Sequence, residues 1–191
     1  MEITTKYNLG DIVSIIDSAM MPVKKNNSMI RGIFAGSFNP FHLGHEYVVN
    51  VASKLVDELY VVIAVNPEKT PPTQFDVTIR SNWIFESVKH ISPNIKVTYT
   101  EGLLVDFCQQ NGIDMMFRGI RNTLDFEKEL IFSESNRIID PTIHTIFIPT
   151  PSELGGISSS LIRTMVQNGK DIKGLVHQPL EIPISKFYRK R

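Results

Sequence analysis

The sequence predicts an α/β fold in which a five-stranded parallel sheet carries helices on both faces. From residue 29 onward, short apolar segments alternate with longer segments whose apolar residues follow helical spacing. Residues 59–65, Leu-Tyr-Val-Val-Ile-Ala-Val, are apolar throughout, which is typical of a strand covered on both faces. Repeated alternation of strand and helix favours right-handed crossovers and therefore a parallel sheet.

The first elements follow from this alternation. Residues 29–35 form an apolar run bounded by glycine and predict a buried strand. Apolar residues at helical spacing predict a helix over 43–56, and the run 59–65 predicts the second strand. A proline-rich loop over 66–75 and a helix over 77–91 are expected next.

The remaining elements continue the pattern as three strands and three helices. The expected strands cover 95–99, 113–117 and 144–148, and the expected helices cover 103–111, 124–139 and 158–168. Each of these helices is followed by a residue that commonly ends helices, namely Gly112, Pro141 and Gly169. The sheet is therefore expected to be doubly wound and Rossmann-like.

The chain divides into three parts. Residues 1–28 are expected to form an N-terminal extension, with a short amphipathic helix from about residue 11 and a polar linker. Residues 29–185 are expected to form one α/β domain. The basic residues 186–191 are interpreted as a solvated tail.

Composition excludes several classes of protein. The chain has 191 residues and equal numbers of basic and acidic residues, 20 each, so nothing indicates an extended nucleic-acid surface. No segment has the length of a membrane span, and no basic region followed by an apolar run suggests a secretory signal. The single cysteine, Cys108, excludes an intramolecular disulfide and favours a reducing compartment. We therefore expect a cytoplasmic protein without nucleic-acid or membrane partners.

Residues 32–45 carry the clearest functional pattern. A strand ends in a glycine turn with Ser37, and His42 and His45 follow around Gly44 at the start of a helix. Backbone N–H groups, the positive end of the helix dipole and imidazole donors would converge there on a phosphate. A zinc site is disfavoured because no cysteine or carboxylate lies nearby at ligand spacing, and we expect no protein metal ligands. The simpler interpretation is a tight turn with two incidental histidines.

Basic residues follow two other strands. Lys69 lies in the loop after the second strand and is either a phosphate ligand or a solvated surface residue. Residues 118–121, Arg-Gly-Ile-Arg, follow the fourth strand, and arginine forks match phosphate oxygens in a two-point manner. The alternative for these arginines is a structural ion pair with Asp125, Glu127 or Glu129, especially for Arg121.

Two glycines and three serines precede the last predicted helix, in the segment Gly155-Gly156-Ile157-Ser158-Ser159-Ser160. One serine is needed as an N-cap, and three exceed that need and suit a triphosphate. The four unusual segments all follow the carboxyl ends of strands, where parallel sheets bind ligands. No Walker sequence and no covalent nucleophile stand out. Many donors without a general base suit transfer between phosphates, where the nucleophile is already ionised.

These residues resemble the nucleotidyltransferase α/β superfamily with its (H/T)xGH motif, here His42-Leu43-Gly44-His45. Within it, the chain is similar to the bacterial-type phosphopantetheine adenylyltransferases over about residues 30–180. The segments that carry this resemblance are Asn66-Pro67-x-Lys69-x-Pro71, residues 102–107, Arg118-Gly119-Ile120-Arg121 and Asp125-Phe126-Glu127-x-Glu129.

The resemblance implies adenylyl transfer from ATP to 4′-phosphopantetheine by direct in-line attack, without a covalent intermediate. The products are dephospho-CoA and pyrophosphate, the cofactor is Mg²⁺, and the assembly is a homo-oligomer, a hexamer in the family. The implied catalytic residues are His45, Ser37, Lys69 and Arg118. Phosphopantetheine is assigned to Ser37, Lys69, Leu104 and Arg118. ATP is assigned to Ser37, Phe38, His42, His45, Gly119, Ile120, Arg121, Glu129, Leu154, Gly155, Gly156, Ile157, Ser158, Ser159 and Ser160.

The chain departs from the family pattern at several positions. Ser37 replaces a threonine, Asn39 replaces an aspartate, and Leu154 stands where an aromatic residue is usual. The sequence of residues 36–42, Gly-Ser-Phe-Asn-Pro-Phe-His, is similar to that of nicotinate mononucleotide adenylyltransferases, so a pyridine mononucleotide is the alternative acceptor. A non-catalytic nucleotide-binding module is the third hypothesis.

Overall fold

The computed structural model of the chain describes residues 29–65 and 74–189. The predicted N-terminal helix, Lys69 and the last two residues lie outside this part of the chain.

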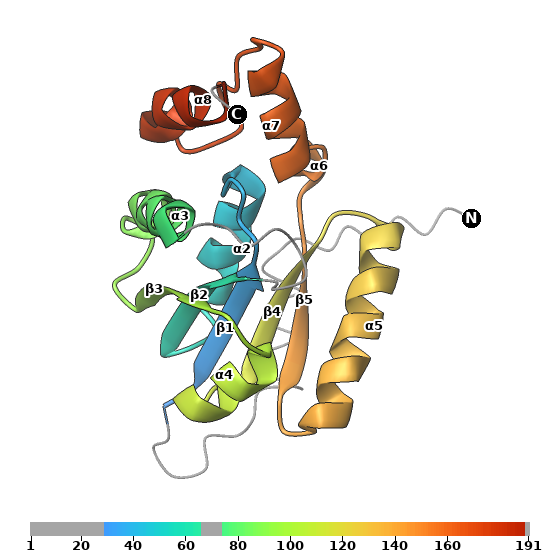
Figure 1. Cartoon of the computed structure of the whole chain (residues 1–191). Helices are drawn as coiled ribbons and strands as arrows, with labels where there is room; N and C mark the ends of the chain where they lie inside the picture. The colour runs from blue at the N-terminus through green and yellow to red at the C-terminus, as the bar shows by residue number, and fades with distance from the viewer. Residues whose placement is uncertain (1–28, 66–73, 190–191) are drawn as a thin grey trace, which may run out of the picture.

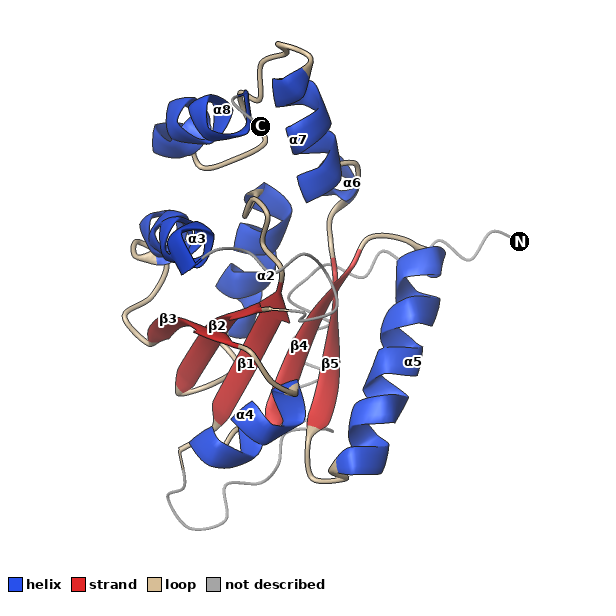
Figure 2. Cartoon of the chain, viewed as in Figure 1, coloured by secondary structure: helices blue, strands red, loops and turns tan. Residues whose placement is uncertain are grey.

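A parallel sheet of five strands forms the centre of the molecule (Figures 1 and 2). Its order is β3-β2-β1-β4-β5, and every neighbouring pair is parallel. The strands are β1 (Arg31–Gly36), β2 (Glu58–Ala64), β3 (Ile95–Thr100), β4 (Met115–Ile120) and β5 (His144–Pro149). The chain moves outward from β1 in both directions, which confirms the doubly wound fold expected from the sequence. The change of direction at β1 places the ligand-binding edge beside β1 and β4.

Four helices cover the two faces: α2 (Leu43–Ala52), α3 (Gln74–Val88), α4 (Leu104–Asn111) and α5 (Thr123–Ile139). Side chains of β1 alternate between these faces. Phe34 packs with α2 and α3 in one apolar cluster, whereas Ile33 and Ala35 pack with α4 in another. Gly112 ends α4 in the left-handed conformation at φ 60°, as its position in the sequence predicts. Among the described helices, none combines the length and apolarity that crossing a bilayer requires.

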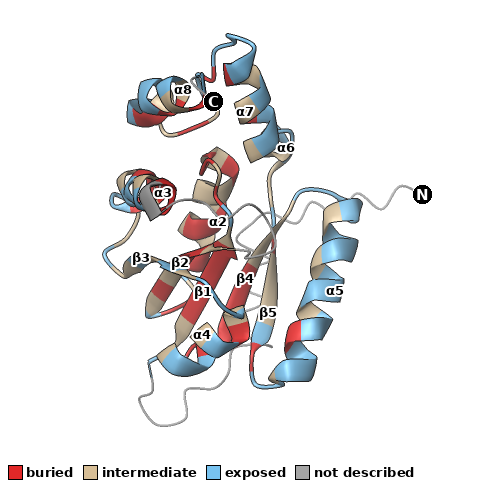
Figure 3. Ribbon diagram, viewed as in Figure 1, coloured by how far each residue is buried: buried red, intermediate tan, exposed pale blue. Residues whose placement is uncertain are grey.

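The C-terminal segments form a layer beyond the carboxyl ends of the strands (Figure 1). This layer consists of α6 (Ser152–Gly155), α7 (Ser159–Gln167), a 3₁₀ turn η1 (Gln178–Leu180) and α8 (Glu181–Arg189). The interpretation of 186–191 as a solvated tail is wrong for residues 186–189. Ile184 and Tyr188, one helical turn apart, are buried in a cluster with Trp83 of α3, while Lys186 is exposed. The apolar stripe thus holds α8 in place. Figure 3 shows buried and exposed stretches along this helix.

Candidate active site

An open cavity of about 400 Å³ lies at the carboxyl ends of β1 and β4. Three of the segments singled out in the sequence line it: the turn after β1 with the start of α2, the end of β4, and the start of α7. The expected site residues that it brings together are Ser37, Phe38, His42, His45, Arg118, Gly119, Arg121, Glu129, Ser158, Ser159 and Ser160. Asp125, which the sequence offers as an ion-pair partner of the arginines, also lines the cavity. Thr150 and Arg163 line it as well, and neither is among the residues predicted from the sequence.

The turn after β1 is held by donors from distant helices. Arg80 of α3, which is buried, donates through Nη1 to the carbonyl oxygen of Ser37 at 2.5 Å. Arg163 of α7 donates to the carbonyl oxygen of Asn39, and Ser159 Oγ donates to that of Pro40 at 2.7 Å. The C-terminal layer is therefore joined directly to the turn that precedes the two histidines.

The two histidines lie against each other, with ring centroids 3.6 Å apart. The backbone N–H of His42 donates to Nδ1 of His45 at 3.3 Å. Phe38 and Phe41 pack against the His45 ring at centroid distances of 5.0 and 5.2 Å. Because Nδ1 accepts a hydrogen bond, the neutral His45 ring carries its hydrogen on Nε2 and is a donor there.

Both imidazoles are poor bases in this environment. Burial lowers the pKa of His45 well below its usual value, and His42, Arg121 and Arg118 lower it further. Burial, with a contribution from Arg121, lowers the pKa of His42 to about 4. Both rings are therefore neutral near pH 7, so His45 offers an N–H to an oxyanion without giving up the proton.

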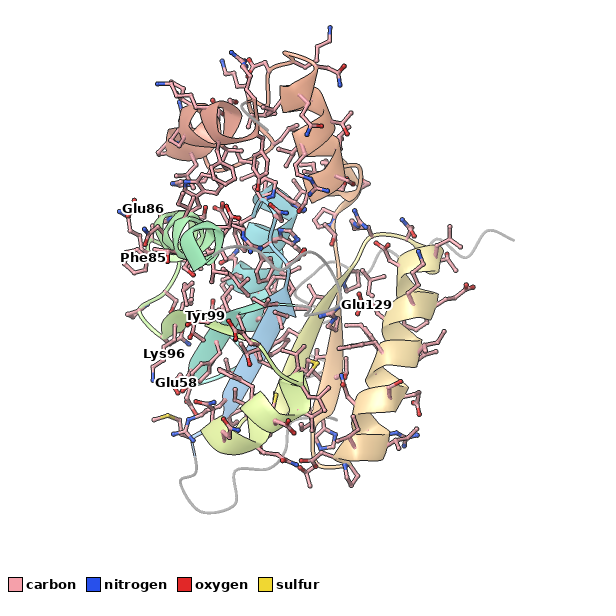
Figure 4. The ribbon with its side chains drawn as sticks, viewed as in Figure 1. Glu58, Phe85, Glu86, Lys96, Tyr99 and Glu129 are labelled. Carbon is pink, nitrogen blue, oxygen red and sulfur yellow. The ribbon has the colours of Figure 1, made fainter. Side chains whose placement is uncertain are left out.

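Arg118 is fixed by a two-point ion pair with Glu129 of α5. Its Nε and Nη2 lie 2.5 and 2.8 Å from the two carboxylate oxygens, and its Nη1 donates to the carbonyl oxygen of Ala35 at 2.8 Å. Figure 4 shows Glu129 between α5 and the sheet. The structural ion pair considered for this arginine is thus present, inside the cavity. Phe132 adds a ring 5.0 Å from the guanidinium carbon.

Arg121 makes the second ion pair that the sequence offered as an alternative. It binds Asp125 at 2.7 and 3.1 Å, one helical turn along α5, and donates to the carbonyl oxygen of Ile157 at 3.3 Å. The spacing of four residues between Arg121 and Asp125 is the sequence signal for this pair. The arginine therefore joins the end of β4 to the segment before α7.

The three serines have different structural roles. Ser158 is the N-cap of α7, since its Oγ accepts from the backbone N–H of Leu161 at 3.2 Å. Ser160 Oγ lies 3.1 Å from Ser158 Oγ, whereas Ser159 binds the turn after β1. Arg163 lies one turn further along and faces the same cavity. A positive side chain in the first turns of a helix that begins with serines is the sequence signal that could have revealed it.

Gly119 is required for packing. A Cβ at this position would lie 2.8 Å from Cγ2 of Val48, closer than side chains approach one another. The glycine lets α2 pack tightly against β4, and this places His45 beside Arg118. Gly119 also lines the cavity, so its assignment to ATP stays a prediction.

Six expected ligand-binding residues do not line the cavity. Leu104 packs with the apolar cluster on the other face of the sheet, and Leu154 and Ile157 pack with the C-terminal helices. Ile120 and the pair Gly155-Gly156 are near it in sequence but are not among the lining residues. Their assignments to ATP or phosphopantetheine stay predictions, as does that of Lys69.

The cavity suits a metal ion carried by a phosphate substrate. Its two described carboxylates, Asp125 and Glu129, are each held by an arginine. Mg²⁺ usually combines few protein ligands with substrate phosphates and water, so the basic lining and the shortage of uncommitted carboxylates fit a nucleotide-bound ion.

The chain is similar to several known proteins in sequence and in structure. The sequence model of the cytidylyltransferase-like family matches residues 33–165. The phosphopantetheine adenylyltransferase of Symbiobacterium thermophilum is 38% identical over 148 residues, 78% of this chain and 90% of the relative. That of Flavobacterium psychrophilum is 37% identical over 154 residues, 81% and 99% of the two chains. A crystal structure of a putative nicotinate-nucleotide adenylyltransferase from Vibrio parahaemolyticus superposes with a TM-score of 0.62 at 19% identity, covering 86% of this chain and 98% of that one. The structural likeness concerns the fold alone.

Proposed function

The chain belongs to the phosphopantetheine adenylyltransferases of the cytidylyltransferase-like family, and we propose that its cavity transfers the adenylyl group of ATP to 4′-phosphopantetheine. The products are dephospho-CoA and pyrophosphate. One observation carries the assignment of chemistry to this cavity: neutral His45, the arginines of β4 and the serine-capped start of α7 line the same space. These groups bind and stabilise negative charge, which is what phosphoryl chemistry requires.

The reaction proceeds by in-line displacement. An oxygen of the acceptor's phosphate, already ionised near pH 7, attacks the α-phosphorus of ATP, and no protein base is needed. The bond between the α-phosphorus and the bridging oxygen to the β-phosphorus breaks, and pyrophosphate leaves with the bonding electron pair. His45 Nε2–H donates to the α-phosphate oxygen on which charge grows, and it does so more strongly in the transition state than in the ground state.

The leaving pyrophosphate is assigned to the start of α7. Backbone N–H groups of this nine-residue helix and the Arg163 guanidinium are the donors suited to it. Mg²⁺, when bound to the phosphates, neutralises charge on them. We assign the acceptor's phosphate to Ser37 and Arg118, which line the same cavity at the ends of β1 and β4.

An acceptor screen tests the proposal. Pyrophosphate release from ATP is measured with 4′-phosphopantetheine and, separately, with nicotinate and nicotinamide mononucleotides. We expect turnover with phosphopantetheine, and loss of that turnover in the His45→Ala variant. Turnover with a mononucleotide alone would establish the alternative acceptor, and ATP binding without turnover on any acceptor would establish a non-catalytic module.

We also propose that the chain forms a homo-oligomer through α5, the hexamer of the family being the expected size. Leu124, Ile131 and Ile138 are 68%, 69% and 84% exposed, and their spacing of seven residues puts them on one face of the helix. A second copy of the chain would cover this stripe. Light scattering should give a mass above that of one chain, reduced by Ile131→Lys but not by Ile182→Lys, a change on exposed α8. A monomeric wild type would refute the proposal.

A further inference from the structure

Three potential metal ligands from distant parts of the chain meet outside the cavity. Glu46 lies on α2, His90 follows the end of α3, and His177 precedes η1. One ligand atom from each lies within 4.8 Å of the others. His90 Nε2 is 3.5 Å from Glu46 Oε1, and His177 Nδ1 is 3.9 Å from Glu46 Oε2. The two imidazoles are nearly parallel, with centroids 5.2 Å apart. Because the three positions are so far apart in sequence, no local spacing could have predicted the cluster.

The three side chains of the cluster lie close together without forming good hydrogen bonds to one another. Both separations exceed the 2.7–3.2 Å usual for hydrogen bonds between nitrogen and oxygen. Oε2 of Glu46 is buried and has no hydrogen-bond partner among the described residues. A buried carboxylate oxygen without a partner is costly, so a cation between the three side chains would satisfy it. The approach of two imidazoles to one carboxylate identifies where that cation would sit.

We propose that Glu46, His90 and His177 bind a divalent transition-metal ion, with Zn²⁺ as the prime candidate. Two imidazole nitrogens and one carboxylate oxygen are ligands that Zn²⁺ favours, whereas Mg²⁺ and Ca²⁺ favour oxygen alone. Tetrahedral coordination at about 2.0–2.1 Å places ligand atoms about 3.4 Å apart. The two measured separations are within about half an ångström of that value, so small side-chain movements complete the site. Water would occupy the fourth position.

The ion would add a link between parts of the fold that already meet through apolar packing and backbone hydrogen bonds. It would connect α2 and the end of α3 to the segment that leads into α8. This segment belongs to the same apolar cluster as α7, whose serines and Arg163 line the cavity. Metal binding is therefore expected to stabilise the C-terminal layer, and this expectation does not depend on the reaction assigned to the cavity.

Direct metal binding tests the proposal. The full chain is stripped with a chelator and titrated with Zn²⁺ by calorimetry, and with Co²⁺ by visible absorption, which reports tetrahedral coordination. We expect one high-affinity ion per chain, an intense tetrahedral Co²⁺ spectrum and a rise in melting temperature with Zn²⁺. His90→Gln and His177→Gln should each weaken Zn²⁺ binding by about 100-fold or more, beyond the 10–100-fold typical of losing an outer partner of a ligand.

His144→Gln is the matched control. His144 is exposed on β5 and lies outside the cluster, so this variant should retain the affinity and the thermal shift. His90→Gln replaces an exposed side chain and keeps the protein folded, which separates loss of metal from loss of structure. Zn²⁺ binding that is unchanged in both cluster variants, or no binding at micromolar Zn²⁺ in the wild type, would overturn the proposal.

Discussion

Acidification should destabilise this protein through its two buried neutral histidines, and the contribution of His42 can be tested by itself. The ring is 6% exposed, and burial is the main reason why its pKa falls from 6.5 to about 4. In the unfolded chain the same ring is hydrated and binds a proton at its ordinary pKa. The unfolded state therefore binds more protons between pH 6.5 and 4, and stability is lost as the pH falls through this window. Above pH 6.5 the contribution is fully present.

The size of the effect follows from the two pKa values. At pH 5 the difference corresponds to a loss of about 2 kcal/mol relative to pH 7.5, and below pH 4 it approaches about 3 kcal/mol. His42→Thr removes the titrating ring, and threonine is a good N-cap residue at the start of α2. We therefore expect the variant to lose about 2 kcal/mol less stability than the wild type between pH 7.5 and 5.0.

Urea unfolding at the two pH values measures this difference. Trp83 is the single tryptophan, is buried against Tyr188, and provides the fluorescence signal. Because each protein is compared with itself at two pH values, a constant effect of the substitution on stability cancels. His144→Thr, at an exposed histidine, should behave as the wild type. If His42→Thr loses as much stability as the wild type, the histidine is not the buried neutral group described here.

Three further substitutions test other parts of the site. His45→Gln should lower kcat by about 10²–10³-fold with a much smaller change in the KM for ATP. A raised KM with normal kcat in the pyrophosphate-release assay would contradict the role of His45 in stabilising the transition state. Arg118→Lys keeps the charge but loses the two-point pair with Glu129, so the KM for the acceptor should rise about tenfold, whereas an unchanged KM would separate this arginine from the acceptor. Gly119→Ala should lower the free energy of unfolding in urea by about 1–3 kcal/mol. Adding Val48→Ala removes the side chain that the new methyl group meets, so the double variant should recover part of this loss. If the free-energy changes of the two substitutions simply add, the predicted clash is absent.

The sequence predicts the sheet and the edge that carries the site for a simple physical reason. Buried parallel strands need continuous apolar runs, and their carboxyl ends meet at one edge, so motifs far apart in sequence are placed together by topology alone. Topology alone does not predict which carboxylates pair with Arg118 and Arg121. Asp125 and Glu129 are separated by one helical turn and face the cavity together, whereas Glu127 between them is exposed. To predict which of the three carboxylates face the cavity, one must know how α5 is oriented about its own axis relative to β4.

The sequence does not predict α8 as a packed helix because its apolar pattern is short. Leu180, Ile184 and Tyr188 follow one another at intervals of four residues and are all buried, which is the spacing of one helix face. Lys186 lies between them and is exposed, as is Arg189 after them, and four of the last ten residues of the sequence are basic. The basic residues indicate only the exposed face of α8, whereas its apolar face packs against Trp83 and fixes the helix to the domain.

That apolar face has a consequence for the reacting centre. Phe38 adopts φ 44°, a left-handed conformation that costs a non-glycine residue about 1–3 kcal/mol. In this conformation its ring packs against Phe34 and His45, so it helps to exclude water from the imidazole. The turn keeps this geometry because Arg80 and Arg163 bind its carbonyl oxygens from α3 and α7. The low basicity of His45 is therefore expected to depend on how the C-terminal layer docks, and loosening that layer should expose the imidazole and raise its pKa.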